Sequence, residues 1–297
     1  MTLEELIASR GWRAEKLDKG WSGDEKYLVT AKNGERLLLR RAPVDQKEKK
    51  RREFEAMHRL DGVKGSFSRP LEWIECEDGA CLLVSWLAGE DAEKALARMT
   101  EPEKYRLGIE AGELLRRIHT VPAPEGLPEW GERFSKKLDR KRPLWLSCPV
   151  EIPGREALIA CVDEGRGLLF GRPQCFQHGD YHVGNQVVDE QGRLGVIDFN
   201  RWDYGDPWEE FNRVVWCAQA SAAYASGYIN GYFGGVPGEA FFRLLRLYIA
   251  ANQLSSVPWA IPFGQGEIDV MTRQARQVLD WYDGMRELVP SWYRGHE

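Results

Sequence analysis

The chain has 297 residues, of which 43% are hydrophobic and 29% are charged, so it is long enough to bury a sizeable core in one or two domains. Its 41 basic and 46 acidic residues give a formal charge of −5, which argues against nucleic acid as a partner, because nucleic-acid binding usually requires a basic face. No apolar run approaches the roughly 20 residues of a membrane helix, and the first residues lack the basic and apolar regions of a signal peptide, so the sequence predicts a cytoplasmic protein without a membrane partner.

The first 85 or so residues predict a small β-rich unit. Four segments have the alternating or apolar character of strands: 26–31, 36–41, 71–75 and 81–86. Asn33-Gly34 stands between the first two segments, and both residues tolerate the positive φ angles of a tight turn, which predicts a β-hairpin. Turn residues at 77–79 separate the other two segments, so this pair also predicts neighbouring strands.

A charged helix is expected between these two pairs of strands. Asp45 and Glu48 have the spacing of a capping box, the reciprocal side-chain and backbone bonding that begins many helices. Three apolar residues would lie on one face of this helix: Phe54, Met57 and Leu60. Gly62 stands where the helix would end, and the basic run at 47–52 is interpreted as a solvated face.

Helical patterns predominate after Leu87. Thr100 and Glu103 have capping-box spacing at the start of a helix that is expected to run to His119. Apolar residues at helical intervals predict two further helices near the C-terminus: 241–249 and 268–282. Only three short strands are expected in this part of the chain: 175–177, 186–188 and 194–197.

These patterns together predict an α+β fold with two lobes of unequal size. The N-terminal lobe, 1–87, would be a small antiparallel-β unit, and the C-terminal lobe, 88–297, would be mostly helical. Ligand sites favour the junction between two such units, so the sequence predicts a binding cleft there.

Two clusters of polar residues follow apolar runs in the second half of the chain: 178–185, which reads H-G-D-Y-H-V-G-N, and 197–199, which reads I-D-F. Each cluster stands where a predicted strand ends, so their side chains can converge. The Asp180 carboxylate can accept or orient the proton of a hydroxyl nucleophile. Asn185 and Asp198 offer oxygen ligands of the kind that Mg²⁺ prefers. Each residue alone is more often a cap or a turn residue, but together they supply what phosphoryl transfer from ATP requires.

The pattern H-G-D-x-x-x-x-N at 178–185, followed by Ile197-Asp198 and by Gly205-Asp206-Pro207, resembles the aminoglycoside phosphotransferase family. That family in turn resembles choline kinases and, more distantly, protein kinases. The resemblance covers nearly the whole chain and implies a two-lobed protein-kinase-like fold. It implies that Asp180 is the catalytic base and that Asn185 and Asp198 hold Mg²⁺.

Two further residues take structural roles under the same resemblance. His178 would brace the catalytic loop through hydrogen bonds rather than take part in acid–base chemistry. Asp206 would tie the following helix to the catalytic loop. An N-cap ahead of Pro207 explains Asp206 equally well, since aspartate is a favoured N-cap residue and proline favours the first helical position.

The N-terminal lobe departs from the family pattern at the residue that holds the nucleotide phosphates. Family members usually carry a lysine in the third strand, whereas the run 36–41 offers only arginines. Arg40 is the candidate for the phosphate clamp, with Glu53 as its partner on the helix, and an ordinary surface arginine is the alternative.

The remaining nucleotide contacts are expected from a loop and from the connector between the lobes. No G-x-G-x-x-G is present, and Gly20 and Gly23 belong to the only loop whose backbone N–H groups could cover the phosphates. An ordinary turn between strands explains these glycines equally well. The connector backbone at Ser85 and Leu87 would meet the edge of the adenine base.

These expectations indicate an ATP- and Mg²⁺-dependent kinase that phosphorylates a hydroxyl of a small, possibly cationic molecule, with GTP left open as the donor. An aminoglycoside-type antibiotic is the leading substrate class, and a choline, amino-sugar or other metabolite kinase is the alternative. A catalytically silent nucleotide-binding pseudokinase is supported only by the missing lysine. A protein kinase is disfavoured, because H-G-D stands where protein kinases have H-R-D.

Overall fold

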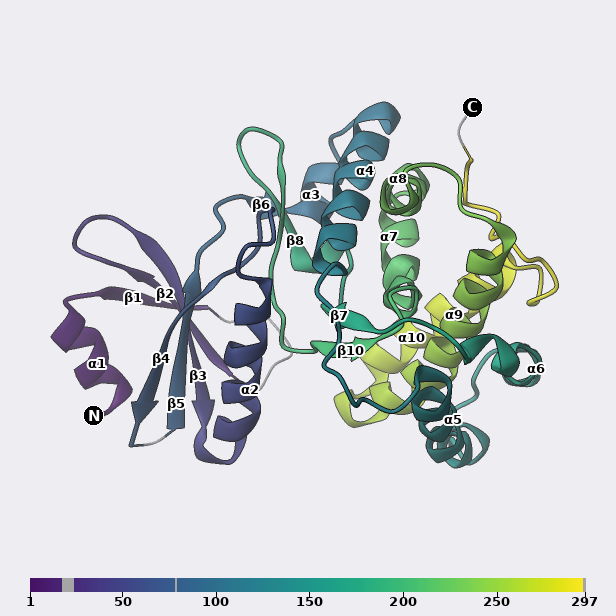
Figure 1. Cartoon of the computed structure of the whole chain (residues 1–297), viewed down its shortest axis with the longest axis horizontal. Helices are drawn as coiled ribbons and strands as arrows, with labels where there is room; N and C mark the ends of the chain where they lie inside the picture. The colour runs from purple at the N-terminus through teal and green to yellow at the C-terminus, as the bar shows by residue number, and fades with distance from the viewer. Residues whose placement is uncertain (18–23, 78, 296–297) are drawn as a thin grey trace. The chain divides into compact units, whose positions relative to one another are not determined.

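The computed structural model describes residues 1–17, 24–77 and 79–295, and its chain forms two units (Figure 1). The first unit combines three segments of the chain: Met1–Ala92, His178–Asp180 and Asn185–Trp202. The second unit combines the other three: Glu93–Gln177, Tyr181–Gly184 and Asp203–Glu297. The segments that carry Asp180, Asn185 and Asp198 therefore all belong to the first unit.

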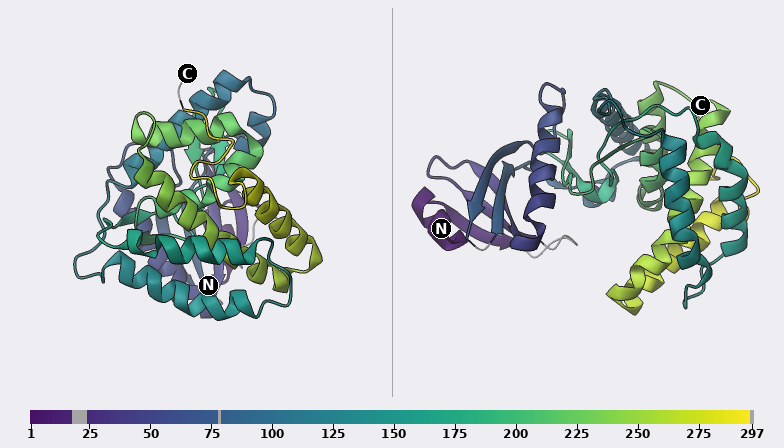
Figure 2. Two further views of the ribbon diagram at one scale, coloured as in Figure 1. Left: turned by 90° about the vertical axis from the view of Figure 1, so that its right-hand side faces the viewer. Right: turned by 60° about the horizontal axis from the view of Figure 1, so that its bottom comes forward.

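A five-stranded antiparallel sheet in the order β1-β2-β3-β5-β4 forms the framework of the first unit. Its strands are β1 (Arg13–Leu17), β2 (Glu25–Thr30), β3 (Arg36–Pro43), β4 (Pro70–Cys76) and β5 (Gly79–Ser85). Two helices, α1 (Leu3–Arg10) and α2 (Lys47–Met57), cover opposite faces of this sheet (Figures 1 and 2). The four strands predicted in this part of the sequence are all present.

The predicted hairpin joins β2 to β3. Gly34 has a φ angle of 84°, and the Asn33 side-chain oxygen accepts a hydrogen bond from the backbone N–H of Glu35 at 3.0 Å. This turn places Lys26 directly opposite Arg40 in the ladder. Because strand side chains alternate between faces, Lys26 and Arg40 share one face, and Val29 lies on the other, in the core beneath α1.

The N-terminal helix and the first strand escaped prediction. Thr2 and Glu5 form a capping box at the start of α1, which buries Leu3 and Leu6 against the sheet. The adjoining strand β1 reads R-A-E-K-L and is largely exposed. It has no apolar alternation, so only its pairing with β2 makes it a strand.

The helix α2 forms as predicted, but the predicted capping box between Asp45 and Glu48 is wrong. Residues Val44–Gln46 form a 3₁₀ turn, and Gln46 occupies the N-cap position without a side-chain hydrogen bond. Glu48 instead pairs with Arg52 one turn further on, at 3.1 Å. A second 3₁₀ turn, His58–Leu60, ends this helical segment just before Gly62.

A small three-stranded sheet completes the first unit. It has the order β6-β8-β9 and consists of β6 (Glu90–Asp91), β8 (Gln186–Val188) and β9 (Leu194–Val196). The backbone of Phe67 forms a parallel bridge with Val196, so this sheet is joined to the N-terminal part of the unit. The last two strands were predicted, and each is followed or preceded by one of the polar clusters.

The second unit is mainly helical. Its helices are α3 (Ala92–Leu96), whose first residue still belongs to the first unit, α4 (Glu101–Ile118), α5 (Trp130–Leu146), α6 (Arg155–Gly165), α7 (Val214–Ala220), α8 (Ala222–Phe233), α9 (Glu239–Ala260) and α10 (Gln265–Trp281). It also contains the antiparallel pair β7 (Cys175–Gln177) and β10 (Asp203–Gly205). The same part of the chain includes four 3₁₀ segments: Arg166–Leu169, Val183–Asn185, Glu209–Arg213 and Ile261–Phe263. The capping box of Thr100 and Glu103 is present, and α9 and α10 match the two predicted C-terminal helices. Across the described residues, no helix combines the length and the apolar character needed to cross a bilayer.

Glycines on α4 and α8 allow the backbones of these two helices to touch. A Cβ atom added at Gly112 would lie 2.2 Å from the carbonyl oxygen of Tyr228, and one added at Gly231 would lie 2.2 Å from that of Ile109. Gly108 and Gly227 make equally close approaches. Since real Cβ atoms do not come this near to a carbonyl oxygen, a side chain at any of these positions would force the helices apart.

We therefore expect Gly112→Ala to lower the free energy of unfolding by about 3 kcal/mol, the upper end of the usual range for overpacking. Gly266→Ala is the matched control, because Gly266 lies in α10 with nothing within 4 Å of an added Cβ. Alanine is the better helix former there, so the control should gain up to about 1 kcal/mol. Denaturant unfolding of both variants measures this, and equal stabilities would contradict the close packing.

Candidate active site

His178 holds the loop that carries Asp180. Its imidazole is fully buried and bonds to two backbone groups. The N–H of Asp180 donates to Nδ1 at 3.2 Å, so Nε2 carries the proton that it donates to the carbonyl oxygen of Ile197 at 3.0 Å. The ring also packs against Phe199, with 4.5 Å between the ring centroids. One imidazole thus joins the loop of Asp180 to the residue before Asp198.

Gly179 permits the turn between His178 and Asp180. Its φ angle is 81°, which favours glycine, and an added Cβ would lie 1.8 Å from the carbonyl oxygen of Arg201. The same Arg201 places its Nε atom 3.7 Å from Oδ2 of Asp180. No motif in the sequence pointed to this arginine, whose position depends on the contact at Gly179.

Asn185 lies against Asp180. Its Nδ2 group donates to the backbone oxygen of Asp180 at 3.0 Å and to the carboxylate oxygen Oδ2 at 3.2 Å. The backbone oxygen of Asn185 accepts from the N–H of Ile197 at 3.0 Å, so the chain next to Asp198 is bonded to Asn185 as well. The structure therefore brings the three predicted residues Asp180, Asn185 and Asp198 together within the first unit.

Asp198 follows β9 with its backbone in the left-handed region, at a φ angle of 69°. Its Oδ1 atom lies 3.3 Å from Nη1 of Arg40, and its Oδ2 atom lies 3.6 Å from Nζ of Lys26. Burial by itself would raise the pKa of this carboxyl, but the positive charges of Arg40 and Lys26 outweigh that effect and hold the pKa below its ordinary value. Asp198 is therefore ionised at neutral pH.

Arg40 lies among three carboxylates. Its Nη1 group donates to Glu53 at 2.6 Å, while Nε and Nη2 both donate to Oδ2 of Asp24, at 3.2 and 2.7 Å. The predicted pairing of Arg40 with Glu53 is thus present. Burial would lower the pKa of the guanidinium, but Glu53, Asp198 and Asp24 together raise it above the ordinary value. Arg40 is only 3% exposed and is not a surface arginine.

Lys50 belongs to the same cluster, which corrects the interpretation of the run 47–52 as a solvated face. Its Nζ group lies 2.5 Å from Asp24 and 2.6 Å from Glu53, and the residue is buried. Residues three apart share a face of a helix, so the pairing of Glu53 with Arg40 was a signal that Lys50 also faces inward. Lys50, Asp24 and Lys26 are members of this cluster that no motif in the sequence indicated.

Four residues predicted to contact the nucleotide do not belong to this charged cluster: Ser85, Leu87, Gly20 and Gly23. Ser85 ends β5, and its Oγ atom accepts from the backbone N–H of Arg69 at 2.8 Å. Leu87 follows in the connector, and its side chain lies against Gly195. Gly20 and Gly23 lie outside the described residues.

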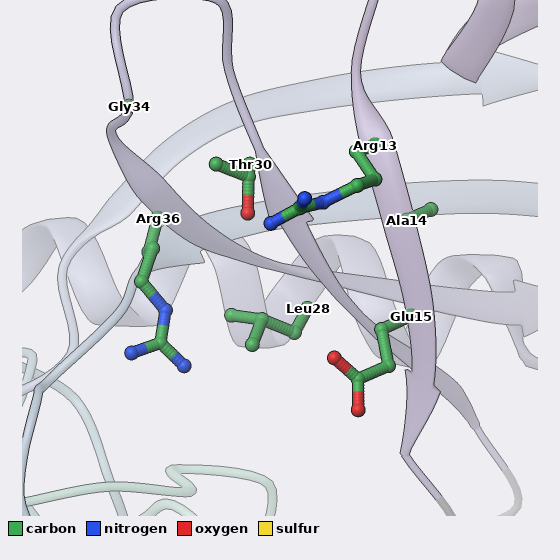
Figure 3. A pocket seen from close by; sticks show the side chains of 7 residues that line it. All are labelled: Arg13, Ala14, Glu15, Leu28, Thr30, Gly34 and Arg36. Carbon is green, nitrogen blue, oxygen red and sulfur yellow. The ribbon is translucent and has the colours of Figure 1, made fainter.

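A cavity of about 430 Å³ opens on the sheet of the first unit (Figure 3). It is lined by Arg13, Ala14, Glu15, Leu28, Thr30, Gly34 and Arg36. Leu28 is two residues from Lys26 on β2, so it lies on the same face of the sheet as Lys26 and Arg40. The guanidinium of Arg36 stacks on the ring of Trp86 in the connector, 5.1 Å from its centroid. The cavity and the charged cluster therefore occupy one face of the small sheet.

Asp206 lies in the second unit, where its carboxylate is fully buried. Arg172 donates to both carboxylate oxygens, at 2.8 and 2.9 Å, and the Tyr248 hydroxyl donates to Oδ2 at 2.7 Å. The backbone N–H of Trp208 also donates to Oδ1 within the turn that follows Asp206, and the backbone oxygen of Asp206 accepts from Gln177 at 2.8 Å. Trp208, not Asp206, occupies the N-cap position of the next 3₁₀ segment, so Asp206 bonds to that turn and to the residue before His178 rather than capping a helix.

The donors near Asp180 suit a magnesium ion. Within the described residues, no three His, Cys, Asp or Glu side chains are placed to hold a metal. Asp198, however, has a buried Oδ1 atom that accepts no hydrogen bond from the described residues, since its 3.3 Å contact with Arg40 is an ion pair only. Asn185 adds an uncharged amide. Mg²⁺ is usually held by one or two protein oxygens together with water and substrate phosphates, so this pair fits it.

The sheet unit, the helical unit and this loop geometry define a small-molecule kinase with a two-lobed protein-kinase-like fold. The model of the phosphotransferase enzyme family, APH, matches residues 13–245, and the chain belongs to that family. The protein is therefore an enzyme, a small-molecule O-phosphotransferase, and the α+β fold expected from the sequence is confirmed.

Several known proteins are similar to this chain. An aminoglycoside 3'-phosphotransferase of Niallia circulans is 29% identical over 222 residues, which cover 71% of this chain and 81% of that protein. The gentamicin complex of APH(2")-IIa has a TM-score of 0.67 at 17% identity, with 92% of this chain and 94% of that chain covered. A choline/ethanolamine kinase family protein of Mesorhizobium loti has a TM-score of 0.67 at 17% identity, with 95% and 93% covered. The two structures show a shared fold.

We expect Asp206→Asn to lower the free energy of unfolding by about 3–5 kcal/mol, because it leaves the guanidinium of Arg172 without its charge partner. Asp203→Asn is the control, since the Asp203 side chain is 62% exposed and 3.6 Å from Arg133, and it should change stability by less than about 0.5 kcal/mol. Thermal and denaturant unfolding measure both. Similar stabilities for the two variants would show that the Arg172 pair contributes little.

Proposed function

We propose that this enzyme transfers the γ-phosphoryl group of ATP, with Mg²⁺, to a hydroxyl group of a small molecule. The observation that carries the proposal is the bonding of Asp180 to Asn185, together with the bonding of both loops to the backbone beside Asp198. A carboxylate, an amide and a second carboxylate with a depressed pKa are thereby held in one place. Phosphoryl transfer depends mainly on such positioning and on neutralising the phosphate charge.

Each of the three residues has a distinct role in this proposal. Asp180 accepts or orients the proton of the attacking hydroxyl, and the nearby Arg201 helps to hold its carboxylate in place. Asn185 and Asp198 hold Mg²⁺, which when bound neutralises charge on the phosphate oxygens. His178 braces the two loops through the backbone, because both of its ring nitrogens bond there.

Nucleotide binding is assigned to the N-terminal lobe, 1–87. The cavity on the small sheet has the size of a ligand site, and the cations around Arg40 lie on the same face, so one end can take the base and the other the phosphates. Ser85 and Leu87 of the connector would meet the base, and Glu53 would hold Arg40 in place. Some related structures contain ADP or ATP and others contain GDP, which supports a purine nucleotide and leaves both ATP and GTP as donors.

Substrate binding is assigned to the C-terminal lobe, 88–297, with an aminoglycoside as the leading class. The relative from Niallia circulans is an aminoglycoside 3'-phosphotransferase, and similar structures hold gentamicin or kanamycin. A choline or ethanolamine kinase activity is the second candidate, because a protein of that family has the same TM-score as the gentamicin complex.

An ATP-consumption screen tests the proposal. The purified enzyme is incubated with ATP or GTP and Mg²⁺ against aminoglycosides, choline, ethanolamine, amino sugars, macrolides and nucleosides, with parallel samples in EDTA. We expect nucleotide consumption that depends on one class of hydroxyl compound and disappears when the metal is removed. Nucleotide binding without transfer to any acceptor would instead favour the silent nucleotide-binding alternative.

We expect Asp180→Asn to lower kcat by about 10²–10⁴-fold, because the group that accepts the hydroxyl proton is lost. Nucleotide affinity should change little, since the amide keeps the shape of the side chain and can still bond to Asn185. Asp189→Asn is the control, because within the described structure the Asp189 carboxylate bonds to Gln191 and Arg193 of its own turn and to no residue of the candidate site. Turnover close to that of the unaltered enzyme would remove Asp180 from the mechanism.

A further inference from the structure

Three cations lie near Asp198, and they differ in the number of donors that already have partners. Arg40, Lys50 and Lys26 all come from the first unit, on β3, α2 and β2. If the proposed function holds, one of these cations binds the nucleotide phosphates. A group that binds phosphate must have N–H donors to offer, so the engaged donors of each cation distinguish the three.

Three of the five N–H donors of Arg40 are engaged by protein carboxylates. Nε and Nη2 both donate to Asp24, and Nη1 donates to Glu53 while lying 3.3 Å from Asp198. Its side chain is 4% exposed. A guanidinium held at all three of its nitrogens is fixed in direction, so it can offer a phosphate only the two N–H groups left on Nη1 and Nη2, and Nη1 already lies beside Asp198.

Lys50 is engaged in a similar way. Its Nζ group contacts Asp24 at 2.5 Å and Glu53 at 2.6 Å, and its side chain is 6% exposed. Asp24 and Glu53 thus each bind both Arg40 and Lys50. These four side chains form a closed set of two positive and two negative charges, because each cation is paired with both carboxylates.

Lys26 stands outside that closed set. It lies directly opposite Arg40 in the ladder of β2 and β3, and its side chain is 13% exposed. Its one ionic partner among the described residues is Asp198, at 3.6 Å, which is longer than a hydrogen bond. A lysine ammonium carries three donors, so Lys26 has donors to offer at the carboxylate that would hold the metal.

We propose that Lys26 is the residue that binds the phosphates of the nucleotide and that Arg40 is a positioning residue. In this arrangement the lysine that family members carry in the third strand is supplied from the second strand, at the position across the ladder. Arg40 contributes positive charge and holds Glu53 and Asp24 in place. The cavity around Leu28 lies on the same face as Lys26, so a nucleotide with its base there can extend its phosphates along β2 toward Asp198.

The test measures affinity for the phosphates separately from affinity for the base. Calorimetry gives Kd values for adenosine, ADP and ATP with Mg²⁺, or for the guanine series if the screen identifies GTP as the donor. For Lys26→Met we expect ATP to bind about 10–100-fold more weakly, as loss of charge-assisted hydrogen bonds implies. Adenosine should bind with unchanged affinity, because the cavity is intact.

Two further variants complete the comparison. Lys26→Arg keeps the positive charge and should recover most of the ATP affinity. Lys16→Met is the matched control, because Lys16 lies on the neighbouring strand β1 with a side chain that is 53% exposed and paired with Glu25, and it should bind ATP normally. Thermal unfolding of each variant checks that the fold is intact.

Three results would overturn the proposal. Unchanged ATP affinity in Lys26→Met together with reduced ATP affinity in Arg40→Met would make Arg40 the phosphate ligand. An equal fall in adenosine and ATP affinity in Lys26→Met would indicate damage to the whole site. If the unaltered enzyme bound neither ATP nor GTP, the proposed function would fail together with this inference, whereas the first two results leave that function standing.

Discussion

The geometry of the candidate active site depends on one imidazole that bonds to two loops. His178 accepts from the backbone of Asp180 and donates to the backbone of Ile197, so two loops separated by 17 residues of chain are held by a single rigid ring. Gly179 brings the first loop against the backbone of Arg201, and Asn185 adds bonds from its side chain and its backbone. Most of these bonds end on backbone atoms. They therefore fix the positions of Asp180 and Asp198 and leave carboxylate oxygens of both residues able to bind a ligand.

Electrostatic balance governs the neighbouring face of the small sheet. Taking a charge out of water is costly unless it is paired and hydrogen-bonded. Six charged groups gather here, three positive and three negative: Lys26, Arg40, Lys50, Asp24, Glu53 and Asp198. Four of them satisfy one another at distances of 2.5–2.7 Å, whereas Lys26 and Asp198 have the longest contact of the group, at 3.6 Å. The loosest pair in the cluster is therefore the pair that is best placed to exchange its contact for one with a ligand.

The sequence predicted those features that arise from local patterns. The hairpin at Asn33-Gly34, the cap at Thr100 and the loop that carries Asp180 all have short signals, and each is present. The helices α5 to α8 and the exposed strand β1 were missed, because their residues become helical or extended through packing and pairing with distant segments. Lys26 could have been found, since a hairpin centred on Asn33 places residues 26 and 40 opposite each other. Lys50 could also have been found, because it stands three residues before Glu53 on α2, whereas the burial of Asp24 depends on contacts with Arg40 and Lys50 that no local pattern indicates.

The backbone conformation of Asp198 lowers the stability of the fold at a residue whose side chain we assign to the reaction. A residue other than glycine in the left-handed region costs about 1–2 kcal/mol, and Asp198 adopts that conformation at a φ angle of 69°. Glycine at this site would relax the main chain and also remove a partly buried acid. If Asp198 holds the metal as we propose, variants selected only for resistance to heat should drift toward losing this side chain, and mutational tolerance here would report whether a lineage still needs the reaction.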